Sequence, residues 1–152
     1  MSLSKESLAK TLAVGLRFFL ALLFLATALG KLLDNRGFAQ VIASYQLAIP
    51  ALGLLPIALA VSLAELWIAI NLCLGRYITA SVLGTLYFHL GYAGLSAITL
   101  WRGIALNNCG CFGVFWGRPL RVTSVLEDLC LALVSLLAWQ LLKVKARTTI
   151  KY

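Results

Sequence analysis

The chain has 152 residues, of which 62% are hydrophobic and 12% are charged, whereas soluble domains are nearly half apolar and about a quarter charged. This composition excludes an ordinary soluble domain and predicts an integral membrane protein surrounded by lipid. The net charge of +8 does not indicate nucleic acid as a partner, because the basic residues stand at the ends of apolar segments and not on one amphipathic surface.

Four apolar segments are long enough to cross the bilayer, whose core of roughly 30 Å takes about 20 helical residues. They cover residues 12–33, 52–74, 77–101 and 125–142. The predicted fold class is therefore all-α, a membrane-embedded four-helix bundle that forms one transmembrane domain over residues 1–152. Arg17 interrupts the first apolar segment, which argues against a cleaved signal peptide, so we expect this helix to be retained.

The connections predict how these helices follow one another. Residues 34–50 are too polar to cross, and four of them at spacings of three and four predict a short interfacial helix between the first two spans: Phe38, Val41, Ile42 and Tyr45. The connection at Gly75 and Arg76 is very short, so the second and third helices should be antiparallel neighbours.

The basic residues predict the orientation. Four spans place both termini on one side, which holds seven basic residues: Lys5, Lys10, Arg76, Lys143, Lys145, Arg147 and Lys151. The other side holds five: Lys31, Arg36, Arg102, Arg118 and Arg121. The positive-inside rule therefore favours cytoplasmic termini and an extracytoplasmic loop over residues 102–124, in a membrane of the bacterial inner type.

Two cysteines in that loop, Cys109 and Cys111, are separated only by Gly110. Disulfides persist outside the cytoplasm, and a bond across so small a ring is strained and easily reduced, which favours thiol exchange. Gly110 supplies the backbone freedom that ring closure requires. Two alternatives stay open: a pair of inert thiols, and a soft-metal site for copper(I), zinc or mercury.

The segment Cys109-Gly110-Cys111-Phe112-Gly113 resembles the CGCFG signature of the MauE branch of the DoxX/MauE membrane proteins. The resemblance extends over residues 12–142. Arg17 with the run to Gly30-Lys31-Leu32 is similar to the family's first helix, and Glu65 is similar to an acidic residue of its second helix.

This resemblance implies a four-helix membrane protein associated with thiol redox chemistry and a thioredoxin-like partner, in which Cys109 and Cys111 are the exchanging pair. It also brings Phe112 and Gly113 into the candidate site. Methylamine does not carry over as a substrate, because nothing in the sequence indicates methylamine metabolism.

The other two cysteines are expected to be packing residues. Cys73 stands at the far end of the second span, nearly a bilayer of roughly 30 Å from the loop. Cys130 lies about 9 Å into the fourth helix, where a role in resolving a mixed disulfide is the alternative. Buried free cysteine usually behaves as a small hydrophobic residue.

Ionisable residues inside the spans should face partners, because charges at membrane depth are costly. Counting residues from the cytoplasmic helix ends places Arg17 and Glu65 at similar depth, so we predict that they form an interhelical ion pair. His89 lies near the middle of the third span, with Glu65 as its nearest acidic neighbour. We expect a hydrogen bond to another helix there, and the alternative is a proton carrier or quinone contact.

The start of the fourth helix carries two acidic residues, Glu127 and Asp128. Ser124 and Glu127 match a capping box, and Asp128 suits the positive end of the helix dipole. Either acid is expected to pair with Lys31, and a proton-accepting role near the cysteines is the alternative.

Together these features predict a membrane thiol-disulfide oxidoreductase that uses Cys109 and Cys111. No cofactor and no metal ligand set is firmly indicated, and a quinone is a candidate electron acceptor. The alternatives are a non-enzymatic assembly or structural subunit of a larger membrane complex, and a soft-metal carrier.

Overall fold

The computed structural model describes residues 2–149 of the chain, with side chains over residues 7–143, and this part contains helices and no strand. The helices are α1 (Ser2–Leu32), α2 (Asn35–Ser44), α3 (Ala51–Leu74), α4 (Ile78–Trp101) and α5 (Val122–Thr149). The prediction of an all-α chain is confirmed. Four of the basic residues used to predict orientation lie outside the described side chains: Lys5, Lys145, Arg147 and Lys151.

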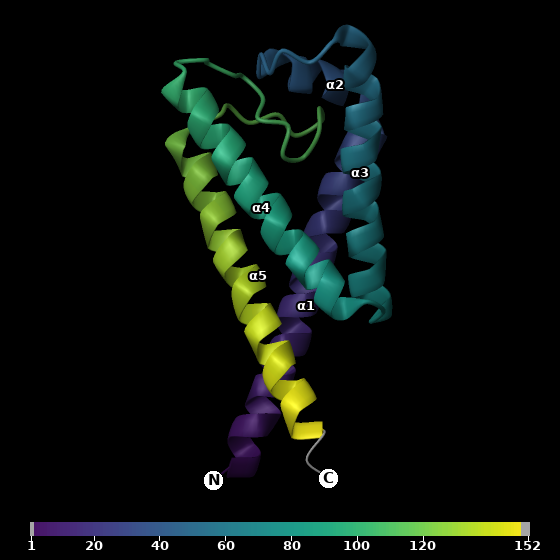
Figure 1. Ribbon diagram of the computed structural model, residues 1–152, viewed down its shortest axis with the longest axis vertical. Helices are drawn as coiled ribbons and strands as arrows, with labels where there is room; N and C mark the ends of the chain where they lie inside the picture. The colour runs from purple at the N-terminus through teal and green to yellow at the C-terminus, as the bar shows by residue number, and fades with distance from the viewer. Residues whose placement is uncertain (1, 150–152) are drawn as a thin grey trace.

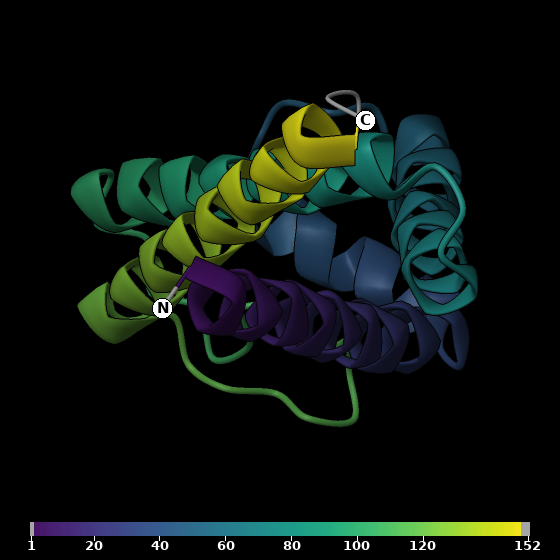
Figure 2. The same cartoon turned by 90° about the horizontal axis from the view of Figure 1, so that it is seen from below.

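The four long helices form two close pairs, α1 with α3 and α4 with α5, and α1 also contacts α5 (Figure 1). Both ends of the chain lie at one end of the molecule, whereas α2 and the connection between α4 and α5 lie at the other (Figure 1). Figure 2 shows the two pairs from the end that carries the termini. The connection between α3 and α4 is tight, as predicted, because Gly75 ends α3 in the left-handed conformation with φ of 70°.

Three of the described helices are long and apolar enough to cross a membrane, over Ser7–Leu32, Ala51–Leu74 and Val122–Lys143. The fourth long helix, α4, has 24 residues but is not one of these three, and polar residues such as Ser81, Thr85 and His89 interrupt its apolar sequence. Most of its polar side chains lie inside the molecule, since the buried residues of α4 include Ser81, Thr85, His89, Ser96 and Thr99. Thr79 and Tyr87 are exposed.

A small apolar core joins the helices. Leu20, Ala21 and Phe24 of α1 pack with Ile68, Ala69 and Leu72 of α3, Val82 of α4 and Ala138 of α5. Many of the largest apolar side chains point outward instead, among them Leu22, Leu63, Leu133 and Leu137. Contiguous apolar surface of this kind marks contact with lipid or with another protein.

Three helix boundaries differ by more than one residue from those predicted. α1 begins at Ser2 and not near residue 12, and α5 runs from Val122 to Thr149 and not from residue 125 to 142. The predicted short helix exists as α2, whose buried Phe38 and Ala39 pack against Ala58 of α3. The first turns of α3 thus stand beside α2, and the C-terminal end of α1 is level with the middle of α3, where Lys31 meets Glu65.

Candidate functional site

The connection between α4 and α5 folds back over the helices. Within it, the Cys109 N–H donates to the Arg118 carbonyl at 2.8 Å and the Leu120 N–H donates to the Leu106 carbonyl at 2.9 Å. These bonds hold the two arms of the loop together, and Cys109 is one of the residues that join them.

The end of α2 fixes this loop from the other side. The Tyr45 hydroxyl donates to the Cys109 carbonyl at 2.7 Å, and the Arg102 guanidinium donates to the carbonyls of Tyr45 and Gln46, each at 3.1 Å. Burial raises the pKa of the Tyr45 hydroxyl, with the nearby cysteine sulfurs adding to the effect. Tyr45 therefore stays a neutral donor.

Glycines let the cysteine segment lie directly on α1. A Cβ atom on Gly30 would stand 2.3 Å from the Phe112 carbonyl oxygen, and one on Gly113 would stand 2.1 Å from the Gly30 carbonyl oxygen. Gly110 and Gly113 also have φ of +74° and +75°, values that glycine adopts without strain. Gly113, which entered the candidate site only by resemblance, and Gly30 thus have a physical role, which is the close approach of two backbones.

The two sulfur atoms of Cys109 and Cys111 lie 2.8 Å apart, and both are free thiols in the structure. The hydrogen bond from the Cys111 thiol, together with a backbone hydrogen bond from Cys111 and the charge of Arg118, lowers the pKa of Cys109 to about 6, against the effect of burial. The same hydrogen bond raises the pKa of Cys111, and burial adds to this rise. These opposite shifts favour a thiolate on Cys109 and a thiol on Cys111.

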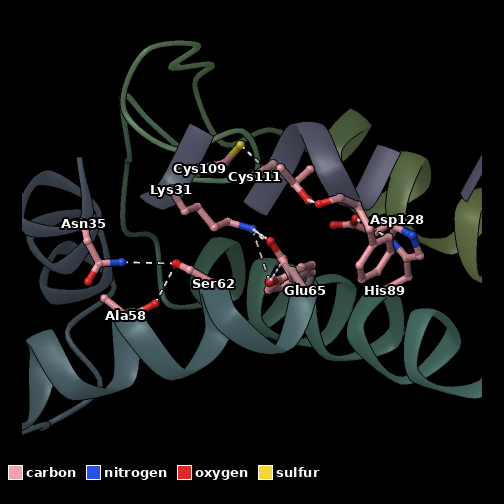
Figure 3. Close-up of polar contacts among 12 residues, drawn as sticks. Lys31, Asn35, Ala58, Ser62, Glu65, His89, Cys109, Cys111 and Asp128 are labelled. Atoms are coloured by element: carbon pink, nitrogen blue, oxygen red, sulfur yellow. Dashed lines mark hydrogen bonds and ion pairs between the residues drawn. The ribbon is translucent and has the colours of Figure 1, made fainter. Parts of the chain in front are cut away.

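A buried ion pair lies next to the cysteines (Figure 3). The Lys31 ammonium donates to both carboxylate oxygens of Glu65, at 2.5 and 2.7 Å, and each side chain is 1% exposed. The Tyr92 hydroxyl donates to the same carboxylate. Three helices, α1, α3 and α4, thus meet at one carboxylate, and Lys31 acts electrostatically on Cys111.

The predicted pair of Arg17 and Glu65 is wrong. Arg17 lies beside Gly75 at the other end of α3, with its guanidinium carbon 4.5 Å from the centre of the Phe18 ring. The depth count assumed that the spans end flush, whereas α1 starts ten residues earlier and α3 extends beyond it along α2. The predicted pairing of Lys31 with Glu127 or Asp128 is also wrong, because Lys31 pairs with Glu65, whereas Glu127 pairs with Arg118 and Asp128 faces His89.

His89 faces Asp128 of α5, with Nδ1 and Oδ1 3.5 Å apart (Figure 3). Asp128, and not the predicted Glu65, is therefore its acidic neighbour. The expected interhelical hydrogen bond is not formed, because neither ring nitrogen has a hydrogen-bond partner among the described residues. The ring instead packs edge-on against Phe24, with centroids 5.4 Å apart.

The predicted capping box at the start of α5 is also wrong. Ser124 lies inside the first turn and accepts from the Arg121 N–H at 3.4 Å, while Glu127 pairs with Arg118 at 2.7 Å. Glu127 is half-exposed, so this ion pair contributes little to stability.

Neither of the remaining cysteines is buried as predicted. Cys73 and Cys130 are both exposed, Cys73 on α3 and Cys130 on α5. Cys130 lines the same cavity as Cys111, which leaves its predicted alternative role untested.

Two cavities flank the cysteines. A cavity of about 380 Å³ between α1, α4, α5 and the loop is lined by residues that include His89, Tyr92, Cys111 and Asp128. A second, of about 150 Å³, lies toward α2 and α3, with Lys31 and both cysteines in its wall. Over the described residues, no three His, Cys, Asp or Glu side chains gather in a way that could hold a metal ion.

Sequence reasoning missed Tyr92 and the true partner of Glu65. Tyr92 follows His89 by three residues, and this spacing places both on one face of a helix, so a signal for a shared polar face was present. No comparable signal shows that Lys31 and Glu65 meet, because that contact depends on how far α3 is shifted along α1.

Comparisons with known proteins agree with the sequence motif. A family model described as methylamine utilisation protein MauE matches residues 9–141. A curated relative, the methylamine utilization protein MauE of Paracoccus denitrificans, is 31% identical over 121 residues, which are 80% of this chain and 64% of the relative. The match thus spans less than two thirds of that relative's length. No solved structure matches the chain.

Proposed function

The chain belongs to the MauE family of integral membrane proteins, and from this premise we propose that it is a thiol-disulfide redox protein in which Cys109 and Cys111 cycle between dithiol and disulfide. The observation that carries the proposal is the pair itself: two sulfurs 2.8 Å apart, one with its pKa lowered to about 6 and the other with its pKa raised.

The exposure of the two sulfurs and the charge of Arg118 define the exchange step. A thiolate of the partner attacks Cys111, the less buried sulfur, and Cys109 leaves as a thiolate that the positive charge of Arg118 stabilises. The second thiol of the partner then attacks the mixed disulfide and releases Cys111. The partner gains a disulfide, and the pair becomes a dithiol with the same two electrons and two protons.

In the membrane arrangement that we propose, α1, α3, α4 and α5 all span, and α2 and the cysteine loop lie at the outer interface. The helix α4 supports this, because it has 24 residues without Asp, Glu, Lys or Arg and buries most of its polar residues. The termini, at the opposite end from the loop (Figure 1), are assigned to the cytoplasm of a bacterial inner membrane by the seven basic residues on that side.

The partner that we propose is a thioredoxin-like protein, as the family resemblance implies. Its active site would approach the loop from the aqueous side, where Phe115 and Trp116 are exposed. Methylamine is not proposed as a substrate of this chain.

Trapping the mixed disulfide tests the proposal. In full-length protein in native membranes, Cys109→Ser removes the sulfur that releases the partner in the reverse exchange, so Cys111 should accumulate a disulfide-linked adduct with the oxidised partner. Cys111→Ser should accumulate much less, because Cys109 is buried, and Cys130→Ser is the matched control, which should resemble the wild type.

Other outcomes favour the rival functions. A structural subunit would be the better explanation if no adduct forms and the double serine variant functions normally and still co-purifies with a large complex. Stoichiometric copper or zinc that disappears in the same double variant would replace the proposal with a soft-metal carrier.

A further inference from the structure

The cavity of about 380 Å³ has features that thiol exchange with a protein partner does not use. Most of its wall is apolar, with Leu23, Phe24, Phe112 and Leu131 among the lining residues. Cys111 and Cys130 also line it, and its polar lining residues are Thr27, Glu65, His89, Tyr92, Arg118, Ser124, Glu127 and Asp128. A cavity with a largely apolar wall on which polar groups converge is typical of a small-molecule site.

His89 is the least satisfied of these polar groups. Its residue is 5% exposed, it lines the cavity, and both ring nitrogens lack a hydrogen-bond partner among the described residues. An unpaired buried polar group is costly, and Asp128 at 3.5 Å is close enough to orient the imidazole without bonding to it at ordinary length. The ring can therefore donate to an oxygen atom placed in the cavity.

The chemistry of the cysteines defines what that oxygen could belong to. If the pair oxidises its partner, as proposed above, it must afterwards lose two electrons and two protons. An acceptor that reaches a cavity between apolar helices has to be soluble in lipid, and a quinone combines this property with two carbonyl oxygens that take up both electrons and both protons.

We propose that this cavity binds a lipid-soluble quinone as the electron acceptor of the cysteine pair, with Cys111 at the quinone ring and His89, oriented by Asp128, donating to a carbonyl oxygen. The inference rests on the proposed redox function and names its acceptor.

The step balances in atoms and electrons. The Cys111 sulfur adds to a ring carbon, its proton goes to one ring oxygen, and the neighbouring Cys109 thiolate then attacks Cys111. The sulfur-sulfur bond forms as the carbon-sulfur bond breaks, and that electron pair stays with the ring. Protonated His89 supplies the second proton, which gives quinol and disulfide.

The experiment follows oxidation of the reduced pair in lipid nanodiscs under anaerobic conditions after addition of decylubiquinone. The two readouts are the cysteine state, from alkylation and intact mass, and the quinol, from its absorbance. We expect one quinol for each disulfide formed.

Variants separate this cavity from the neighbouring groove. Thr27→Phe fills the cavity, and Ala26→Phe, one residue earlier on α1, is the matched control because Ala26 lines a different groove beside Phe115 and Trp116. Thr27→Phe and His89→Leu should each slow oxidation by quinone about 100-fold, as expected for loss of binding or of a general acid. Ala26→Phe should oxidise at the wild-type rate.

Diamide, an oxidant that needs no binding cavity, distinguishes the two proposals. All three variants should form the disulfide with diamide at the wild-type rate. If the wild type does not form it with diamide, the redox function itself is refuted. If the wild type reacts with diamide but not with decylubiquinone, the quinone cavity is refuted and the redox function stands. The same conclusion follows if Ala26→Phe blocks oxidation by quinone and Thr27→Phe does not. A wild-type rate of quinone reduction in His89→Leu would overturn the role given to His89.

Discussion

Replacing Lys31 with methionine should leave the buried Glu65 carboxylate with Tyr92 as its remaining hydrogen-bond donor among the described side chains. Both members of the pair are 1% exposed, and the ammonium lies 2.5 and 2.7 Å from the carboxylate oxygens. Removing one partner of such a pair costs about 3–5 kcal/mol, because it leaves an uncompensated buried charge. Lys31→Met should therefore lower the free energy of unfolding by this amount, and Glu65→Gln should do the same from the other side.

The double variant Lys31→Met/Glu65→Gln should be more stable than either single variant and within about 2 kcal/mol of the wild type, because neutral replacement of a buried pair is often close to neutral. The assay is unfolding by sodium dodecyl sulfate in mixed micelles, followed by tryptophan fluorescence. Lys10→Met is the matched control, since Lys10 is an exposed lysine of the same helix. A double variant that loses the sum of the two single losses would show that the two residues are not coupled.

Three further predictions concern the loop. Alkylation of Cys109 in the reduced protein should be half-maximal near pH 6, because the thiolate forms above its pKa. Cys111→Ala should shift this midpoint upward, whereas the control Cys130→Ala should not. Identical midpoints in Cys111→Ala and the wild type would contradict the assignment of the hydrogen bond. Gly113→Ala should lower the free energy of unfolding by about 1–3 kcal/mol more than Gly103→Ala does in the same assay. Both positions have positive φ, but of the two only Gly113 contacts another backbone. Equal losses of stability would disprove the close approach to Gly30. Tyr45→Phe should lower the free energy of unfolding by about 1 kcal/mol and speed hydrogen exchange of the Cys109–Gly113 amides. The control Tyr87→Phe, at an exposed tyrosine, should leave this exchange unchanged.

The sequence predicted the features that depend on short stretches of chain. The apolar segments and the stripe at Phe38, Val41, Ile42 and Tyr45 led to five helices near their observed places. The cysteine pair was predictable because its members are two residues apart, so their proximity needs no knowledge of the packing.

Features that depend on the relative shift of helices were not predictable. The pairing of Glu65 with Lys31, and not with Arg17, follows from the position of α2 beside the first turns of α3, which no local pattern encodes. The predicted capping box was wrong for a related reason. Ser124 and Glu127 have the right spacing, but the helix begins at Val122. Glu127 instead forms an ion pair with Arg118 of the folded-back loop.

The buried face of α4 shows the same limit. The spacing of His89 and Tyr92 places them on one side of the helix, but only the packing determines that Tyr92 meets Glu65 and that His89 meets Asp128. A polar face on a membrane helix could therefore be recognised from the sequence, whereas its partners could not.

The most direct test of the redox function is the mass of the intact protein after alkylation, with and without prior reduction, on protein taken from membranes under acid quench. If Cys109 and Cys111 cycle as proposed, reductant should make two additional sulfurs reactive, and peptide analysis should assign both to the loop. If the two loop sulfurs are already fully reactive without reductant, and stay so after treatment with diamide, the pair does not form a disulfide and the central claim is wrong.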